Sequence, residues 1–145
     1  MATPEYSIQI NRIYFNIYKN NIRIQPKSVP QRIEFISITS SNYDGKVNFT
    51  TLISPINEEF RTYLPQPDLL IVSADKEDVM AGTQAGMERI ASMARRFSEW
   101  TIAEHLISSE LESGDIIVKD GSLQTSFIKE NIYVNNLFKK AEEKI

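Results

Sequence analysis

A proline-free stretch over residues 78–111 shows helical periodicity and constrains the fold more than any other feature. Apolar residues recur in it at intervals of three and four positions, the spacing that lines one face of an α-helix. They are Met87, Ile90, Ala91, Ala94, Phe97, Trp100, Ala103, Ile107 and Leu111. We predict an amphipathic helix here, with a break near Gly82 or Gly86 and an end at the glycine of "ESGD". Such a helix buries its apolar face against a sheet or another helix.

The N-terminal half alternates apolar and polar residues, as strands do when one face is buried. A strand is expected over 6–18, and its apolar parity changes between Ile10 and Ile13, which predicts a bulge near Asn11-Arg12. "KNNI" predicts a turn that returns through residues 22–24 as a hairpin. "RIEFISIT" and "VNFTTLI" predict two more strands joined by a turn at "NYDGK", so this half is expected to be an antiparallel meander.

The C-terminal half continues with a proline-punctuated connector and the long helix. "DLLIVSAD" in the connector predicts a short strand or the lead-in to a helix. After the long helix, the apolar run "DIIVKD" predicts a buried strand that ends in Asp120, and a second helix is expected over 129–145. Together these elements predict a single α/β layered domain over residues 1–145.

Composition limits which metal sites the chain can form and where the protein is expected to be located. The chain has no cysteine and one histidine, His105, so disulfides and thiolate metal sites are excluded and a metal would be held mainly by carboxylates, as Mg or Mn is. No apolar run reaches the roughly 18 residues of a membrane span, and the N-terminus lacks a signal-peptide pattern, so we expect a cytoplasmic protein. Residues 1–35 carry five basic side chains against two acidic ones, which indicates either a local basic face or an ordinary solvated surface.

Two carboxylates are candidates for chemistry. Asp120 in "GDIIVKDGSLQTSF" follows an apolar run and precedes a glycine, so it either starts a turn or is presented at a strand end as a metal ligand. Glu99 lies beside the apolar stripe of the long helix, where it either pairs with Arg95 four residues earlier or faces a metal. Glu104 is a reserve candidate. Trp100 is expected in the core rather than as a platform for stacked bases.

Residues 95–144, which begin "RRFSEWTIAEHLISSELESGDIIVKDGSLQTSF", resemble the NurA nuclease family. The likeness rests on a helix with arginines and a glutamate, an apolar strand that ends in Asp-Gly-Ser-Leu, and a following helix in register. It implies a ribonuclease H-like fold and a Mn2+- or Mg2+-dependent DNA nuclease that acts in end resection with a HerA-type hexameric ATPase. Asp120 and Glu99 would be its metal-binding catalytic residues. DNA is the expected substrate and a homodimer the expected assembly.

The sequence also departs from the family pattern. No aspartate precedes Asp44, and Asp44-Gly45 lies in a turn-like context, so the family's first metal aspartate has no counterpart and the domain is expected to be incomplete. Arg12, Lys19, Arg23, Arg95 and Arg96 are the residues expected to contact DNA. Two alternatives stay open: a non-catalytic NurA-like module that binds DNA or a protein partner, and an unrelated α/β domain whose carboxylates are surface residues.

Overall fold

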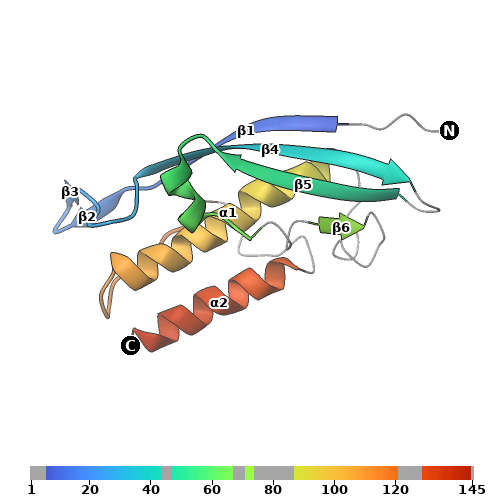
Figure 1. Ribbon diagram of the computed structural model, residues 1–145. Coiled ribbons are helices and arrows are strands. Elements are labelled where there is room, and N and C mark those ends of the chain that lie inside the picture. The colour runs from blue at the N-terminus through green and yellow to red at the C-terminus, as the bar shows by residue number, and fades with distance from the viewer. Residues whose placement is uncertain (1–5, 44–46, 67–70, 74–86, 121–128, 145) are drawn as a thin grey trace.

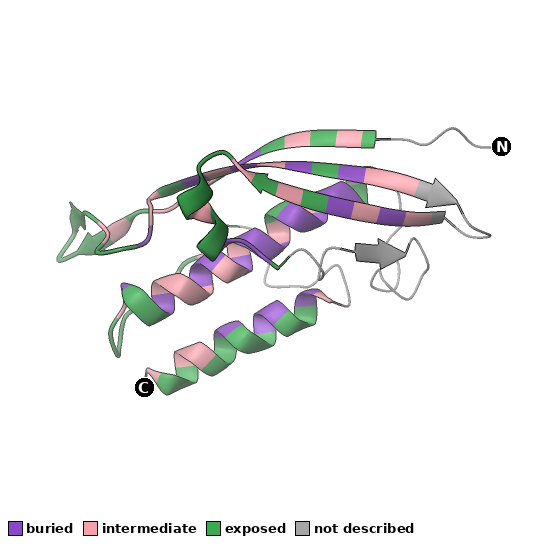
Figure 2. Cartoon of the chain, viewed as in Figure 1, coloured by how far each residue is buried: buried purple, intermediate pink, exposed green. Residues whose placement is uncertain are grey.

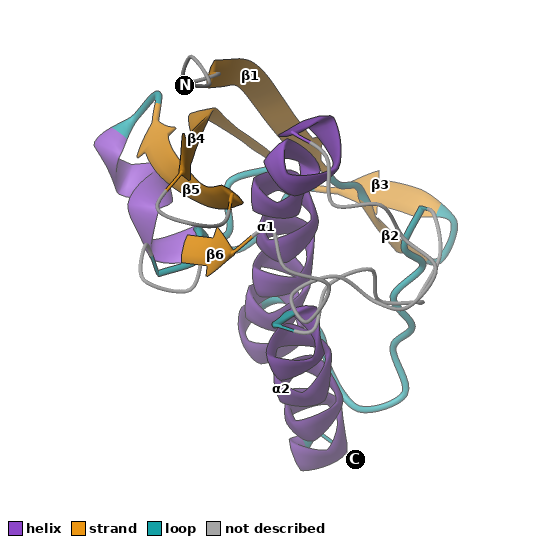
Figure 3. Cartoon of the chain, turned by 90° about the vertical axis from the view of Figure 1, so that its right-hand side faces the viewer, coloured by secondary structure: helices purple, strands orange, loops and turns teal. Residues whose placement is uncertain are grey.

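The computed structural model describes residues 6–43, 47–66, 71–73, 87–120 and 129–144. It is a mixed α/β structure with an antiparallel sheet and two long helices. The sheet has the order β1-β4-β5-β6, from β1 (Tyr6–Tyr14), β4 (Arg32–Tyr43), β5 (Val47–Pro55) and β6 (Ile71–Ser73). Both helices, α1 (Met87–Ser109) and α2 (Glu130–Glu143), lie on the same side of this sheet (Figures 1 and 3). The predicted antiparallel meander and the two helices are confirmed.

A small hairpin of β2 (Ile17–Lys19) and β3 (Ile22–Ile24) projects from the end of β1. Asn20 and Asn21 at its turn have φ angles of 52° and 65°, the left-handed values that a tight hairpin turn requires at both central positions. Asparagine tolerates this conformation better than most residues do, so the turn predicted at "KNNI" is confirmed. A short 3-10 helix, η1 (Glu58–Tyr63), follows β5.

Helix α1 is buried on two sides, which is why its apolar stripe is so wide. On one side Phe97, Trp100 and Ile107 pack with Tyr133 and Leu137 of α2. On the other side Ala94 and Ile102 pack against Ile33 and Phe35 of β4. The alternation of buried and exposed residues along both helices is visible in Figure 2. The predicted core position of Trp100 is confirmed, since its side chain is fully buried.

On the helix side, the sheet buries four polar side chains of β1, β4 and β5 beside apolar ones such as Phe35. Asn11, Ser37, Thr39 and Thr51 are all buried on the helix side of the sheet. They satisfy one another across strands, because the Asn11 amide donates to the Ser37 hydroxyl over 2.9 Å and the Thr39 and Thr51 hydroxyls bond over 2.9 Å. Apolar residues of the opposite parity face away from the helices. We call this set the outer apolar patch: Tyr6, Ile8, Ile10, Ile36, Ile38 and Leu52.

The bulge predicted near Asn11-Arg12 is wrong. β1 pairs with β4 in one unbroken register from Tyr6 opposite Ser40 to Tyr14 opposite Arg32. The parity changes because apolar residues move from the outer face at Ile10 to the inner face at Ile13, not because the strand carries an extra residue. The strand expected over 6–18 therefore ends at Tyr14, and β2 is a separate element.

The buried strand predicted at "DIIVKD" is also wrong. Residues 111–120 form no helix or strand, and Ile116 and Val118 are 83% and 91% exposed. Among the described residues, Ile116, Ile117 and Val118 make no main-chain hydrogen bond, so the extended segment lacks the neighbouring strand that would bury it.

Other predictions fall partly or wholly on residues that the structure does not describe. "DLLIVSAD" contains the short strand β6, and the residues of this segment on either side of β6 lie outside the described residues. The predicted helix start at residues 78–86, the turn at Asp44-Gly45 and the "GSLQTSF" half of the motif also lie outside them. Neither α-helix within the described ranges has the length and apolar content that crossing a membrane requires.

Candidate functional site

Glu99 and Asp120, the two predicted ligands, line one pocket of about 550 Å³. The pocket lies between the end of β1, the middle of α1 and the extended segment 111–120. Four cationic side chains also line it, which are those of Arg12, Arg95, Arg96 and Lys119. We call this cavity the basic pocket. Three of the five residues predicted to contact DNA are therefore brought to the same place as both predicted carboxylates.

Within the basic pocket, Glu99 is engaged by two cations. Its Oε1 atom lies 3.5 Å from Nη1 of Arg95, one helical turn earlier, and its Oε2 atom lies 3.1 Å from Nζ of Lys119. The ion pair with Arg95 weighed in the sequence analysis is thus present. The Glu99 side chain is 26% exposed, so the carboxylate faces the pocket while remaining partly screened by water.

Lys119 attaches the extended segment to α1. Its ammonium lies 4.8 Å from the ring centroid of Trp100, within the range of a cation–π contact, and also bonds the Asp120 carbonyl over 3.3 Å. Its side chain is only 16% exposed. Lys119 therefore holds the segment against the helix in place of the strand pairing that was expected there.

Arg96 is positioned by Glu130, a residue that the sequence analysis missed. The fully buried Glu130 carboxylate in the first turn of α2 lies 3.0 Å from Nη2 of Arg96 and accepts a 2.7 Å hydrogen bond from Nε1 of Trp100. An acidic residue in the first helical turn is favoured by the helix dipole, which was the available sequence signal. Nothing in the spacing indicated that the partner would be Arg96, 34 positions earlier.

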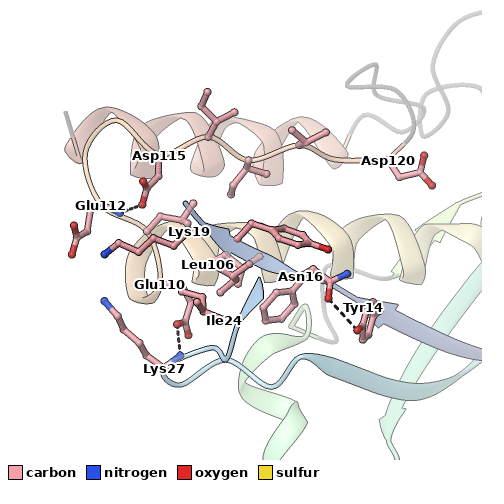
Figure 4. A pocket seen from close by; sticks show the side chains of 17 residues that line it. Tyr14, Asn16, Lys19, Ile24, Lys27, Leu106, Glu110, Glu112, Asp115 and Asp120 are labelled. Carbon is pink, nitrogen blue, oxygen red and sulfur yellow. Dashed lines mark hydrogen bonds between the residues drawn. The ribbon is translucent and has the colours of Figure 1, made fainter. Parts of the chain in front are cut away.

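Of the five residues predicted to contact DNA, Lys19 and Arg23 do not line the basic pocket. Arg12 pairs with Glu34 across β1 and β4 at 3.4 Å. On the hairpin, the Arg23 guanidinium donates to the Tyr14 hydroxyl over 2.6 Å. Lys19 lines a second pocket of about 620 Å³, which has Asp120 at one end and Glu112 and Asp115 at the other (Figure 4).

Glu110 also lines the second pocket, and it was not singled out by the sequence. Its buried carboxylate follows the last turn of α1 and accepts hydrogen bonds from the main-chain N–H groups of Lys27, Ser28 and Val29. Burial raises the pKa of the Glu110 carboxyl, but the three N–H donors lower it more, so the pKa lies below its usual value. This arrangement fixes the loop before β4 to the end of α1.

The described residues do not fit a two-metal centre. They contain no group of three or more His, Asp or Glu side chains placed to hold an ion. β1 contributes Arg12, Ile13 and Tyr14 to the basic pocket, and no carboxylate. A divalent ion at Glu99 would also lie beside the Lys119 ammonium, a like-charge contact. Of the other candidates, Glu104 is half-buried and does not line the basic pocket, and His105 packs its ring edge-on against Tyr63 at 4.9 Å.

Comparison with known proteins identifies no relative. No family model matches this chain, no curated protein matches it, and no solved structure matches it.

Proposed function

We propose that this chain is a DNA-binding domain of the NurA type that holds phosphate groups of the DNA backbone in the basic pocket. The observation that carries the proposal is the lining of that pocket, in which four cationic side chains from β1, α1 and the extended segment surround two carboxylates. Phosphate oxygens are recognised by arginine and lysine side chains held in fixed positions. Glu34 and Glu130 lie outside the lining and hold Arg12 and Arg96 in place.

The arrangement of elements supports the ribonuclease H-like part of this proposal. An antiparallel meander is followed by a long helix packed on one face of the sheet. The extended segment then returns past the end of β1, because both line the basic pocket.

Salt dependence of DNA binding tests the proposal. Each phosphate contact contributes about 0.7 to 0.9 to the slope of log affinity against log salt, so Arg95→Gln should weaken binding and lower that slope by about one contact. Lys139→Gln removes the same charge from an exposed position on α2 outside the pockets and serves as the control. Fluorescence anisotropy with a labelled DNA duplex measures both. Equal slopes for Arg95→Gln and the wild type would show that the basic pocket does not contact the DNA backbone.

A metal-dependent nuclease working with a HerA-type ATPase is the second candidate function. It is favoured by one observation, that Glu99 and Asp120 line the same pocket. It requires at least one more carboxylate, contributed from outside the described residues, because two ions need several converging ligands. Calorimetric titration of Mn2+ into the wild type and into Asp120→Ala tests it, and equal binding by the two proteins would exclude Asp120 as a ligand.

A further inference from the structure

The extended segment 111–120 leaves its central main chain without hydrogen-bond partners. Among the described residues, the N–H and C=O groups of Ile116, Ile117 and Val118 take part in no hydrogen bond. The side chains alternate as they do in a strand, because Ile117 and Lys119 are half-buried whereas Ile116 and Val118 are 83% and 91% exposed. The segment thus has the pattern of a strand that lacks a neighbour.

Contact with solvent accounts poorly for this sequence. A hydrated loop is ordinarily rich in serine, asparagine, glycine and proline, whereas Ile116-Ile117-Val118 is a run of β-branched apolar residues. Such residues are enriched in strands, where side chains of the neighbouring strand pack against them. Consecutive unpaired main-chain groups are also the part of a structure to which a further strand is added. A strand from another polypeptide would meet both requirements.

The second pocket lies along this segment and supplies the space for an added strand (Figure 4). It has a volume of about 620 Å³ and extends along the segment from Asp115 to Asp120. A strand of about five or six residues matches this length, at roughly 3.3 Å per residue. The lining also includes the apolar side chains of Leu106 and Phe15. An added strand would therefore find side chains to pack against as well as main-chain groups to bond.

The charges of the second pocket favour a strand with a basic residue at one end. The ammonium groups of Lys19 and Lys27 lie toward the end at which Glu112 and Asp115 lie (Figure 4). At the other end Asp120 is exposed, and its carboxylate takes part in no ion pair among the described residues. A lysine or arginine beside Asp120 would form the cross-strand pair of opposite charges that stabilises neighbouring strands.

We propose that residues 115–120 bind an extended strand of a partner protein, which is added to the segment in the second pocket. The main chain of the partner strand pairs with that of residues 116–118. Its outer side chains are β-branched and apolar beside Ile116 and Val118 and basic beside Asp120. The proposal does not rest on DNA binding by the basic pocket.

Binding of a designed peptide tests this site without any change to the protein. The probe is the fluorescein-labelled peptide Ser-Lys-Thr-Ile-Val-Ile-Ser, which in antiparallel pairing places its lysine beside Asp120 and its isoleucines beside Val118 and Ile116. Two further peptides carry N-methyl groups, one on the threonine and the valine and the other on the two isoleucines. Successive N–H groups of a strand point to opposite sides, so only one of these peptides loses the donors that face the segment.

Fluorescence anisotropy should show saturable binding of the unmodified probe. One N-methylated peptide should bind at least about 10-fold more weakly than the other, because each lost donor leaves a main-chain carbonyl unpaired. Absence of binding by the probe, or equal binding by the two N-methylated peptides, would overturn the proposal. A protein that sediments as a dimer and that the probe converts to a monomer would assign the segment to a second copy instead.

Charge reversal tests the basic end of the partner strand. Asp120→Lys should weaken binding of the probe about 3-fold or more, and it should bind a probe with glutamate in place of lysine more tightly than the wild type does. Glu142→Lys makes the same change at an exposed position on α2 outside the pockets and should leave both affinities unchanged. The same response from both variants would show attraction by net charge alone and would contradict the pairing beside Asp120.

Discussion

Single carboxylates hold distant parts of this chain together. Glu110 joins the end of α1 to the loop before β4 through three consecutive main-chain donors, and Glu130 joins α2 to Arg96 and Trp100 of α1. Neither was singled out by the sequence analysis, because both partners are far away in sequence and the contacts form only once α1 is placed. By contrast, the pair of Glu99 with Arg95 could be predicted, since it depends only on the helical repeat.

Removing the charge of Glu110 should make the free energy of unfolding depend less on pH in the acidic range. Because the folded pKa is lower than the unfolded pKa, the carboxylate stabilises the fold above the unfolded value and loses this effect as pH falls through the folded value. Glu110→Gln keeps an acceptor but loses the charge-assisted bonds, so we expect a loss of about 1 to 2 kcal/mol at neutral pH. Urea unfolding measures this, with the exposed Glu142→Gln on α2 as control. A loss of the same size near pH 3 (roughly, below the usual glutamate pKa) as at neutral pH would contradict this account.

Glu130→Gln should destabilise the contact between the two helices more than Glu110→Gln destabilises its loop. The carboxylate is fully buried and is bonded by both Arg96 and Trp100, so losing its charge weakens a desolvated pair. We expect a loss of about 2 to 3 kcal/mol in the free energy of unfolding. Urea unfolding, followed by far-UV circular dichroism and by the fluorescence of the single tryptophan, measures it. A change below about 0.5 kcal/mol, the range of surface substitutions, would show that the pair is solvated.

At the scale of elements, pattern identified strands and helices well but assigned their faces poorly. The alternation in β1 predicts a strand, yet apolar residues of one parity face outward at Ile8 and Ile10 and those of the other face inward at Ile13. Sequence alone assigns apolar residues to the core, and the placement of α1 on the opposite side decides otherwise. For the same reason "DIIVKD" resembled a buried strand, although a strand is buried only where a neighbour pairs with it.

The position of the extended segment 111–120 can be tested directly, because two neighbouring isoleucines in it differ in exposure. Ile116 is 83% exposed, whereas Ile117 is partly buried against the cluster between α1 and α2. Ile116→Ser should therefore change the free energy of unfolding by less than about 0.5 kcal/mol, and Ile117→Ser should lower it by about 1 to 2 kcal/mol. Chemical denaturation of the two variants compares them. Equal losses of 2 kcal/mol or more, the cost of truncating a buried core residue, would show that both side chains are buried, as in the strand predicted from the sequence.

At the scale of the whole molecule, the α/β class and the two helices could be predicted, because they follow from periodicity. The basic pocket could be predicted in part. Glu99 and Asp120 were expected to converge, and they line one pocket. The close approach of Lys119 to Glu99 was not expected, because it depends on the extended segment lying along α1 rather than inside the sheet. That contact changes the chemistry, since it places a cation where a metal ligand was expected.

The two candidate functions predict opposite results for one substitution, Glu99→Gln. If the basic pocket binds phosphate, removing this carboxylate frees Arg95 and Lys119 and eliminates its repulsion of the ligand, which at about 1 kcal/mol should raise DNA affinity about 3- to 10-fold. Fluorescence anisotropy of a labelled duplex at fixed salt, with and without Mn2+, is the measurement, and Glu142→Gln is the matched control. We expect Glu99→Gln to bind the duplex more tightly than the wild type under both conditions. Unchanged or weaker binding, or Mn2+-dependent cleavage by the wild type that Glu99→Gln abolishes, would contradict it.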